Sequence, residues 1–557
     1  MEKVCFSETS EQQQQATFWY SPETGVYYSK HPSVRLPTES VLDVVSFLFS
    51  HQHNGVSALV DSSSGYSISY SELFPLVKSV ACGLHHMGIS QGDVVLLLLP
   101  NSIYFPVLFL AVLYLGAIVT PMNPLSSLSE IKKQASDCNV RFAFTLYENV
   151  GKLKVLGTPV IAVPQNPATD SNQVRFSAFY KLLSGNFDLV RKPVIRQQDT
   201  AAILYSSGTT GASKGVVLTH RNFIAAIELF VRFEASQYEY LSSENVYLAV
   251  LPMFHIYGLS LFALGLLSLG TSIVVMKKFD ASEMLKAIDR YRITHFPTVP
   301  PILVALTRGA KGVCGNSLKS LKQVSSGAAP SSRKIIEDFV EAFPDVDLIQ
   351  GYGMTESTAV GTRGFNTPTI HKYLSIGLLA PNVQAKVIDW VNGSVVPPGS
   401  TGELWLRGPG TMKEYLNNPE ATMSTIDNEG WLRTGDIAYF DEDGYLYIVD
   451  RLKEIIKYKG FQIAPADLES VLIAHPEILD VAVTGVMDKK LGEIPVAFVV
   501  RSDGSSLTEA AVIDYLAQQV APYKKVRRVV FTQSIPKSAA GKILRRELKN
   551  SLAASRL

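Results

Sequence analysis

The sequence predicts an α/β protein with a large N-terminal body of α/β subdomains, a small β-barrel-like subdomain and a small α+β C-terminal domain. In the first 380 or so residues, apolar strand-like runs alternate with helical stretches, which is typical of largely parallel sheets. From about residue 386, short β-type runs are interrupted by Gly and Pro. The length of 557 residues also requires several domains, because a single hydrophobic core stops growing near roughly 250–300 residues.

Each element of the body is predicted from a local pattern of apolar residues. Short, continuous apolar runs favour buried strands, whereas longer apolar or amphipathic segments favour helices. The predicted strands are 93–99, 117–121, 200–205, 245–251 and 272–276. The predicted helices are 103–115, 222–233 and 281–291.

Two further units follow the body. Residues 386–450 contain a predicted hairpin, because the Asp443-Gly444 pair has apolar runs on both sides. In residues 451–557 we predict helices at 465–474 and 507–520 and strands at 481–486 and 495–500. We therefore expect a first domain at 1–450, with its β-rich part at about 386–450, and a second domain at 451–557.

The charge of the chain argues against a nucleic-acid partner. The formal net charge is +1, whereas proteins that bind duplex nucleic acid usually show a basic excess. Residues 451–557 hold 17 Lys and Arg against 11 Asp and Glu, a local charge of +6, and the remaining 34 and 39 leave −5. The basic segment could face a small anionic ligand or could be an ordinary basic surface.

Cysteine usage and the apolar runs indicate an intracellular protein without a membrane span. Cys5, Cys82, Cys138 and Cys314 form no CxxC pair and no zinc-type spacing, so we expect reduced thiols. The N-terminus lacks the apolar segment of a signal peptide. The apolar runs 103–119 and 258–276 contain Pro, Gly or Ser, and we interpret them as buried elements.

The final tripeptide predicts peroxisomal import. A C-terminal Ser-Lys-Leu is a peroxisomal address, and Arg556 between Ser555 and Leu557 keeps its charge and shape. The import receptor is therefore an expected partner.

The strongest chemical signal is the loop YSSGTTGASKG at 205–215, which follows a predicted buried strand. Its glycines let several backbone N–H groups converge, and its hydroxyls and one ammonium add donors for a polyphosphate. A Walker P-loop of a kinase or NTPase is the alternative. It fails in two places, because Ser213 stands where that motif needs Gly and Gly215 where it needs Ser or Thr.

Seven motifs of this chain resemble those of the adenylate-forming superfamily, which comprises acyl- and aryl-CoA ligases, beetle luciferases and peptide-synthetase adenylation domains. They occur in the same order along the chain as in that superfamily. Beside the loop they are LPMFHIYG (251–258), SSGAAP (325–330), QGYGMTES (350–357), GWLRTGD (430–436), DRLKEIIKYKG (450–460) and PKSAAGK (536–542). The nearest resemblance is to plant 4-coumarate:CoA ligases and their ligase-like relatives.

This resemblance implies a two-step ligase reaction. The acid attacks the α-phosphate of ATP to give an acyl-adenylate and pyrophosphate, and the thiol of coenzyme A then displaces AMP to give a thioester. Carboxylic acid, ATP and coenzyme A are thus the expected partners, and Mg²⁺ the expected cofactor, with Glu356 as its ligand. The residues implied for ATP and AMP are Ser206, Ser207, Gly208, Thr209, Thr210, Lys214, Gln350, Gly351, Tyr352, Thr355, Asp436, Arg451 and Lys542.

The remaining roles are implied by the same motifs. Lys542 is the expected catalytic residue of adenylation, and Lys453 marks a hinge about which a mobile C-terminal domain turns. His255 would orient the carboxylate or gate the coenzyme channel, although a core histidine bonded to backbone is the alternative. The implied acyl-substrate residues are His255, Tyr257, Ala328, Lys453 and Lys457, of which His255, Lys453 and Lys457 are also catalytic candidates. The implied coenzyme A residues are Lys278, Lys459 and Gly460.

Departures from the 4-coumarate:CoA ligase pattern concern the acid. Trp405 occupies a position where those enzymes typically have Cys, Ala212-Ser213 replaces Leu-Pro, and STAVGTRG follows Glu356. The acid could therefore be a cinnamate-type acid, a jasmonate precursor or a fatty acid. A luciferase-like adenylate-forming oxygenase, and a nucleotide-binding protein without turnover, are alternatives on the same fold.

Overall fold

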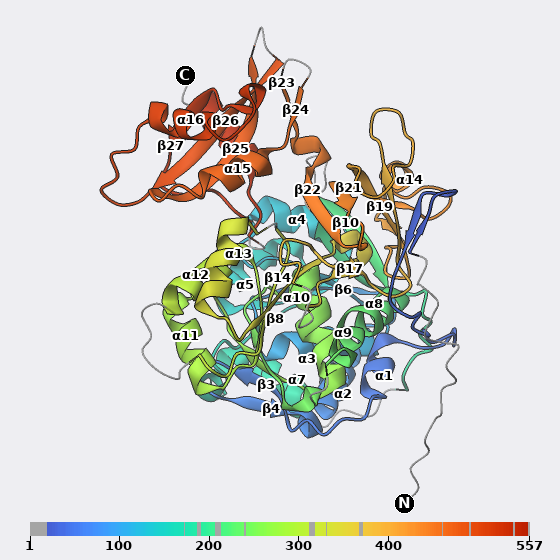
Figure 1. The fold of residues 1–557 in the computed structure, drawn as a ribbon. Helices are drawn as coiled ribbons and strands as arrows, with labels where there is room; N and C mark the ends of the chain where they lie inside the picture. Colours follow the sequence, from blue (N-terminus) through green and yellow to red (C-terminus); the bar gives the residue numbers. More distant parts are fainter. Residues whose placement is uncertain are drawn as a thin grey trace, which may run out of the picture.

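The protein divides into a large body and a smaller C-terminal part that sits on one end of it (Figure 1). The computed structural model describes residues 19–171, 173–185, 191–206, 213–238, 241–310, 318–329, 331–366, 371–458, 461–488, 492–538 and 541–554. The α/β fold with a large N-terminal and a small C-terminal domain agrees with the sequence prediction.

The first sheet of the body has seven strands in the order β20-β10-β9-β6-β5-β7-β8. Its strands from β9 to β8 are parallel, whereas β10 and β20 are antiparallel additions at one edge. The strands are β5 (Val94–Leu98), β6 (Ile118–Pro121), β7 (Val140–Leu146), β8 (Val160–Val163), β9 (Thr200–Ser206), β10 (Lys214–Thr219) and β20 (Glu414–Tyr415). The predicted strands 93–99, 117–121 and 200–205 are therefore confirmed within a residue or two.

The second sheet has nine strands in the order β17-β16-β15-β14-β13-β11-β12-β3-β4. Its central strands are parallel, and antiparallel strands complete both edges. They are β3 (Ser57–Asp61), β4 (Ser67–Ser69), β11 (Val246–Ala249), β12 (Ser272–Val275), β13 (His295–Thr298), β14 (Gln323–Ser326), β15 (Asp347–Tyr352), β16 (Thr362–Arg363) and β17 (Leu378–Leu379). The carboxyl ends of β14 and β15 lead directly into the SSGAAP and QGYGMTES motifs.

Helices fill the space between and around these sheets. They are α1 (Val44–Phe49), α2 (Tyr70–His86), α3 (Tyr104–Tyr114), α4 (Leu128–Asp137), α5 (Val150–Leu153), α6 (Pro167–Asp170), α7 (Ser177–Ser184), α8 (His220–Ala226), α9 (Phe233–Ser236), α10 (Ile256–Gly258), α11 (Ala281–Arg290), α12 (Pro300–Ala310) and α13 (Arg333–Ala342). A π-helical turn, Ile227–Arg232, joins α8 to α9, so the predicted helix 222–233 is continuous but locally widened.

The apolar runs that could suggest a membrane segment belong to the core. Every residue of α3 except the half-buried Tyr114 at its end is buried, because the helix packs against α2 on one side and the π-helical segment Leu259–Leu264 on another. A helix that is surrounded by other elements is apolar on all its faces, because no face contacts water. Within the described residues, no helix is both long and apolar enough to cross a membrane.

The β-rich subdomain is an antiparallel six-stranded sheet in the order β1-β2-β18-β19-β21-β22. Its strands are β1 (Tyr20–Ser21), β2 (Val26–Tyr28), β18 (Gln384–Ile388), β19 (Gly402–Arg407), β21 (Leu432–Phe440) and β22 (Leu446–Arg451), and α14 (Pro419–Thr425) lies beside it. The hairpin predicted at Asp443-Gly444 joins β21 to β22. The sequence did not predict β1 and β2, whose partner strand lies more than 350 residues away.

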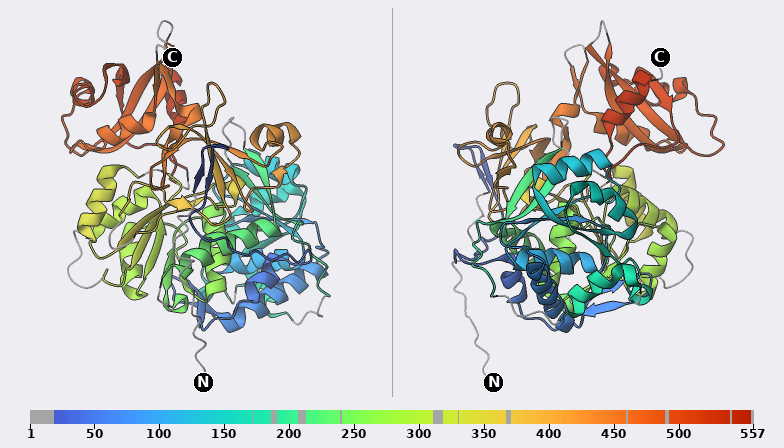
Figure 2. Two further views of the ribbon diagram at one scale, coloured as in Figure 1. Left: turned by 45° about the vertical axis from the view of Figure 1, so that its right-hand side comes forward. Right: turned by 180° about the vertical axis from the view of Figure 1, so that it is seen from behind.

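The C-terminal part has its own sheet and its own core. The strands are β23 (Ile456–Tyr458), β24 (Phe461–Ile463), β25 (Ile478–Asp488), β26 (Gly492–Arg501) and β27 (Arg528–Phe531). The helices are α15 (Pro465–Leu472), α16 (Glu509–Ala517) and α17 (Arg545–Ala554). A buried cluster from Ile456 to Val529 packs within this part and is separate from the core of the body. In all views this part sits above the body at one end (Figure 2).

Candidate active site

One cavity of about 1570 Å³ lies where the C-terminal part meets the body. Its walls come from the ends of β9, β14 and β15, from the β21–β22 hairpin, and from the segment around Lys542. Thirteen of the residues implied by the sequence motifs line it, although they come from positions 206 to 542. They are Ser206, Lys214, His255, Tyr257, Ala328, Gln350, Gly351, Tyr352, Thr355, Glu356, Asp436, Arg451 and Lys542.

The end of the cavity beside Ser206 and Lys214 is built around a buried carboxylate. Ser206 Oγ donates to Glu356 Oε1 at 2.8 Å, and the Tyr415 hydroxyl donates to the same oxygen at 2.9 Å. Lys214 lies close by, with its Nζ 4.8 Å from the centroid of the Tyr415 ring. Among the described residues, Glu356 has no ion-pair partner. A buried carboxylate with hydroxyl neighbours and no cation is chemically suited to a hard divalent metal ion.

The opposite side offers polar groups that suit a ribose. The Tyr352 hydroxyl donates to Asp436 Oδ2 at 2.6 Å, and Arg451 Nε lies 3.5 Å from Asp436 Oδ1. Burial, together with the negative charge of Asp436, raises the pKa of Tyr352 well above its ordinary value. Asp436 and Arg451 face each other because they are paired in the register of β21 and β22. A carboxylate held in this way can accept hydrogen bonds from two vicinal hydroxyls.

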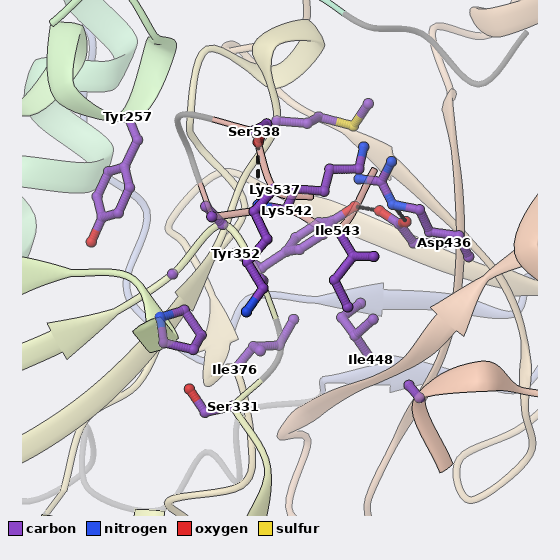
Figure 3. Close-up of a pocket in the computed structure, with 18 of the residues that line it drawn as sticks. Tyr257, Ser331, Tyr352, Ile376, Asp436, Ile448, Lys537, Ser538, Lys542 and Ile543 are labelled. Atoms are coloured by element: carbon purple, nitrogen blue, oxygen red, sulfur yellow. Dashed lines mark hydrogen bonds and ion pairs between the residues drawn. The ribbon is translucent and has the colours of Figure 1, made fainter. Parts of the chain in front are cut away.

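Lys542 enters the cavity between these groups and Tyr257, as Figure 3 shows. Its turn is held by hydrogen bonds between Ser538 and Lys542, and Gly541, with a φ of +78°, packs against Val299 and Pro301 of the body. Burial, and then the positive charges of Arg451 and Lys453, lower the pKa of Lys542 to about 8. The body and the C-terminal part therefore meet in an arrangement that delivers this ammonium to the cavity.

His255 and Tyr257 form the other side of the cavity. His255 caps α10, and its Nδ1 accepts a hydrogen bond from the backbone N–H of Tyr257 at 3.4 Å. Burial, and then the charge of Lys542, lower the pKa of His255 to about 4, so the imidazole is neutral near pH 7. The ring of Tyr257 lies against Gly327, where a Cβ would be 3.1 Å from Tyr257 Cε1.

The wall between these two sides requires unusual backbone. Ala328, Thr358 and Ala359 all have positive φ, between +53° and +66°, which non-glycine residues rarely adopt. Gly353 permits a close approach here, because a Cβ on it would lie 2.4 Å from the backbone oxygen of Ala359. Strained backbone of this kind is concentrated at functional sites in proteins.

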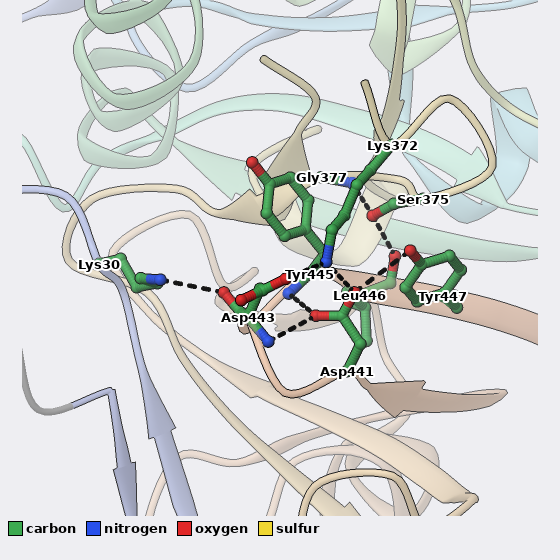
Figure 4. A network of polar contacts seen from close by, with 9 residues as sticks. All are labelled: Lys30, Lys372, Ser375, Gly377, Asp441, Asp443, Tyr445, Leu446 and Tyr447. Carbon is green, nitrogen blue, oxygen red and sulfur yellow. Dashed lines mark hydrogen bonds and ion pairs between the residues drawn. The ribbon is translucent and has the colours of Figure 1, made fainter. Parts of the chain in front are cut away.

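A polar network outside the cavity holds another part of its wall (Figure 4). Lys372 Nζ binds Asp441 and Asp443 at 2.6 and 2.5 Å, and Ser375 Oγ donates to the backbone oxygen of Leu446. The segment fixed in this way contributes Leu374 and Ile376 to the cavity, and the backbone oxygen of Tyr373 accepts a hydrogen bond from Gln350 Nε2 at 2.7 Å.

Several predicted residues lie elsewhere. Lys453, Lys457 and Lys278 do not line the cavity, and all three are exposed. Ser207, Gly208, Thr209, Thr210, Lys459 and Gly460 lie outside the described residues, as do Ser555, Arg556 and Leu557. Their predicted roles stay predictions.

The sequence reasoning missed residues that reach the cavity only through tertiary contacts. Tyr415 contacts Glu356 because β20 pairs with β10, and no local sequence pattern predicts this pairing. Arg363 lines the cavity and forms a buried ion pair with Glu234. Trp405, noted as a departure, donates its indole N–H to Glu403, and Glu403 in turn accepts from the backbone N–H of Gly435 beside Asp436.

Comparisons with known proteins show the family to which the chain belongs. Residues 49–416 match the family described as AMP-binding enzyme, and residues 467–542 match the AMP-binding enzyme C-terminal domain. The chain is 64% identical to "4-coumarate--CoA ligase-like 6" of Arabidopsis thaliana, over 98% of this chain and 97% of that protein. It is 46% identical to "Peroxisomal OPC-8:0-CoA ligase 1" of the same plant, over 94% and 95%.

Solved structures give the same result. The ATP-bound MatB of Rhodopseudomonas palustris matches with a TM-score of 0.82 at 26% identity, covering 91% of this chain and 98% of that one. The o-succinylbenzoate CoA synthetase of Bacillus subtilis with its acyl-adenylate intermediate matches with a TM-score of 0.78 at 26% identity, with the same coverages.

The fold and the site define an adenylate-forming enzyme, and the chain belongs to the AMP-binding enzyme family. Within that family its relatives place it among the plant 4-coumarate–CoA ligase-like enzymes. It is an AMP-forming acid–CoA ligase. The P-loop kinase alternative is thereby excluded.

Proposed function

We propose that the cavity performs the adenylation half of the ligase reaction, with Lys542 as its catalytic residue. The observation that supports this most directly is the position of the Lys542 ammonium between the Asp436–Arg451 side and the His255–Tyr257 side. Nucleotide on the first side and acid on the second would bring the carboxylate and the α-phosphate together at Lys542. Negative charge accumulates at that point in the transition state, and a preorganised cation stabilises it.

The nucleotide would be held along one wall of the cavity. Asp436 would accept from the ribose hydroxyls, with Arg451 donating to the same sugar, while Gln350, Gly351, Tyr352 and Thr355 would line the adenine and the α-phosphate. Lys214 and Ser206 would contact the β- and γ-phosphates, together with residues 207–210 of the same loop.

Glu356 would hold Mg²⁺ at the phosphate end. Its carboxylate fits a hard cation, as described above, and no cluster of three or more His, Cys, Asp or Glu that could hold a metal by itself occurs among the described residues. One or two carboxylates with substrate phosphates and water are the usual magnesium environment. The bound ion would neutralise phosphate charge and orient pyrophosphate for departure. Chelation of divalent ions should stop pyrophosphate release, and Glu356→Gln should raise the Mg²⁺ concentration needed for half-maximal rate.

We further propose that the chain divides into domains at 1–450 and 451–557, and that Lys453 marks a hinge between them. The separate core of the C-terminal part supports this division. A turn about the hinge would withdraw Lys542 after adenylation. It would bring Lys457, Lys459 and Gly460 toward the acyl-adenylate and coenzyme A, with Lys278 contacting the coenzyme's phosphates.

The acid is proposed to be a cinnamate-type acid, a jasmonate precursor or a fatty acid, and the reaction to take place in the peroxisome. The 46% identical relative is named a peroxisomal OPC-8:0-CoA ligase, which supports both statements. Ser555, Arg556 and Leu557 would be the signal that the import receptor binds. Removal of these three residues from a fluorescently tagged chain should leave it in the cytosol, and continued import would contradict the proposal.

Incubation with ATP, Mg²⁺, coenzyme A and a panel of acids tests the proposed function. The expected products are AMP, pyrophosphate and an acyl-CoA in equal amounts. AMP with oxygen uptake and no thioester would support the luciferase-like oxygenase instead. Tight ATP binding without any product would support a binding protein without turnover.

A further inference from the structure

The Tyr257 side of the cavity contains a buried ion pair that the ligase chemistry does not require. Arg363 Nη2 donates to Glu234 Oε1 at 2.8 Å, and Arg363 Nε lies 2.5 Å from Glu234 Oε2. Both residues are more than nine-tenths buried, with exposed fractions of 7% and 8%. Arg363 comes from β16, and Glu234 comes from α9, directly after the π-helical turn that places Phe230 in the cavity. Such a pair is costly to bury, so its position beside a ligand cavity calls for a functional explanation.

The two-point contact with Glu234 leaves part of the guanidinium available. The third nitrogen, Nη1, lies over Gly351 in the cavity wall, where a Cβ would be 3.1 Å away. The contacts with Glu234 use Nη2 and Nε, and the Tyr257 hydroxyl lies within reach of the guanidinium. The guanidinium carbon lies 5.2 Å from the centroid of the Phe230 ring, so an aromatic ring covers one face of the group. Arg363 therefore lines the cavity with N–H donors that Glu234 does not occupy.

The Tyr257 hydroxyl is the second polar group at this place. It is buried and makes no hydrogen bond of normal geometry in the described part of the chain. It nevertheless lies near Arg363: although burial lowers the pKa of that guanidinium, the charge of Glu234 and the proximity of Tyr257 raise it above its ordinary value. Figure 3 shows Tyr257 on the opposite side of Lys542 from Asp436. The polar groups of Tyr257 and Arg363 are therefore separate from the side where we propose that the nucleotide binds.

The end of the acid remote from its carboxylate could be a hydrocarbon, a second carboxylate or a neutral oxygen. The charges around Arg363 and Tyr257 favour one of these three. A hydrocarbon end would leave the buried Tyr257 hydroxyl and the Arg363 N–H groups with only their poorly aligned contact with each other, which is unfavourable. A second carboxylate would also be unfavourable, because Glu234 already neutralises Arg363 and a third charge would have no counterion. The neighbouring His295 has its pKa lowered to about 3 by burial and by the charges of Lys322 and Arg363, so it adds no cation. A neutral oxygen can use both groups, accepting from Arg363 and bonding to the Tyr257 hydroxyl.

We propose that Arg363, held by Glu234, and Tyr257 form a recognition site for an uncharged oxygen, a hydroxyl or a carbonyl, at the end of the acid remote from its carboxylate. The inference rests on the proposed function, because it places the acid on this side of Lys542. Arg363 and Tyr257 touch the substrate and determine specificity. Glu234 is a positioning residue that acts through Arg363.

The test compares five acids on the full-length enzyme, with pyrophosphate release and acyl-CoA formation as readouts. Two matched pairs differ by one oxygen: 4-hydroxycinnamic with cinnamic acid, and 8-hydroxyoctanoic with octanoic acid. Octanedioic acid tests a second carboxylate. In at least one pair, kcat/KM for the oxygenated acid should exceed that of its partner by roughly 10- to 100-fold, the range of a hydrogen bond to a charged group. Octanedioic acid should be the poorest of the three C8 acids.

Two variants assign this preference to the named side chains. Tyr257→Phe removes one oxygen and should reduce the ratio of kcat/KM between the two members of the preferred pair by about 5- to 10-fold. Arg363→Met combined with Glu234→Leu replaces the ion pair by apolar groups of similar length, which buried pairs usually tolerate without loss of folding. This double variant should lower the same ratio by at least 10-fold. Arg363→Met alone would leave Glu234 buried without a counterion and is therefore not informative.

Control variants keep the result specific. Tyr114→Phe on α3, and Lys286→Met with Glu283→Leu on the exposed face of α11, make the same chemical changes away from the cavity and should leave the ratios unchanged. Equal or better turnover of cinnamic and octanoic acids by the unmodified enzyme, or ratios unaffected by both variants, would overturn the inference while leaving the ligase function intact. Failure of all five acids to release pyrophosphate would overturn this inference, and failure of the whole acid panel would contradict the proposed function as well.

Discussion

At the scale of single residues, the cavity contains two titratable groups, Lys542 and His255, whose pKa values are lowered by burial and by neighbouring charges. Lys542 has its pKa lowered to about 8 by burial and by Arg451 and Lys453, and His255 has its pKa lowered to about 4 by burial and by Lys542. At pH 7 the site therefore holds a cation on Lys542 and a neutral imidazole on His255. This combination can stabilise a pentacovalent phosphate without placing a second positive charge beside the acid.

Replacement of Lys542 should separate the two half-reactions. Lys542→Ala removes the cation at the point where charge develops, so acyl-adenylate formation should fall by at least roughly 10²–10³-fold. Thioester formation from supplied acyl-adenylate should be largely retained. Pyrophosphate release and acyl-CoA formation measured separately check this. Lys549→Ala, an exposed lysine on α17, is the matched control, and equal loss of both half-reactions would contradict the assignment.

The pH profile of adenylation should report the same lysine. Lys542 is cationic below its pKa of about 8 and loses its proton above it. Because kcat/KM reflects the free enzyme, it should decline above about pH 8, by up to tenfold per pH unit. Lys542→Arg keeps its charge at all accessible pH values, so whatever activity it retains should show no such decline. A wild-type profile that is flat to pH 9.5 would argue against the role of the ammonium.

At the scale of elements, one arginine links the segment after β22 to the helices and sheet of the C-terminal part. Arg545 at the start of α17 binds Glu454 after β22 at 2.5 Å, Glu469 on α15 at 2.6 Å, and the backbone oxygen of Val483 on β25 at 2.9 Å. Burial raises the pKa of Glu469 to about 7, although Arg545 opposes the shift. Two acids thus share one cation beside the segment that leads from the body to β23.

The stability of this element should depend on pH through Glu469. Its folded pKa of about 7 exceeds the ordinary value of 4.5, so between these values only the unfolded chain ionises and stability falls as pH rises. The full shift corresponds to about 3 kcal/mol at most. Glu469→Gln should flatten this dependence. Hydrogen exchange of the α17 amides between pH 4.5 and 7.5 measures it, with the exposed Glu547→Gln as control. A slope that persists in Glu469→Gln would assign it to other groups.

At the scale of the whole molecule, the contact between the two parts is the one that the proposed adenylation step requires. Gly541 packs against Val299 and Pro301 of the body, and Lys542 lies in the cavity. In the same arrangement Lys457, the middle residue of β23, is exposed and lies outside the cavity. If the small domain turns between half-reactions, these two lysines exchange places at the site.

Replacement of Lys457 should therefore give the opposite pattern to that of Lys542. Lys457→Ala should retain acyl-adenylate and pyrophosphate formation and should slow acyl-CoA formation from supplied acyl-adenylate by at least about tenfold. Gln462→Ala is a matched control, because Gln462 is exposed and pairs with Lys457 across the same hairpin. Normal thioester synthesis by Lys457→Ala would exclude a role in the second half-reaction.

Most elements were predictable from local pattern because their periodicity reflects their own burial. The strands at 93–99 and 272–276 and the helix at 281–291 match β5, β12 and α11 within two residues. The hairpin of β1 and β2 was not predictable, since β2 pairs with β18 far along the chain. The π-helical turn at Ile227–Arg232 was also missed, because widening of a helix depends on what packs against it.

By itself, the sequence determined the reaction class, because motifs that bind phosphate, ribose and metal are short and keep their chemistry wherever they are placed. It also predicted, from their motifs, that Lys542 and Asp436 act in the same reaction. Only the tertiary structure decided which side chains surround them. Tyr415 reaches Glu356, and Glu234 reaches Arg363, through contacts between elements 59 and 129 residues apart. Such contacts depend on how sheets and helices pack, and residues far apart in the chain form the wall of the cavity beside Tyr257 where we propose that the acid binds.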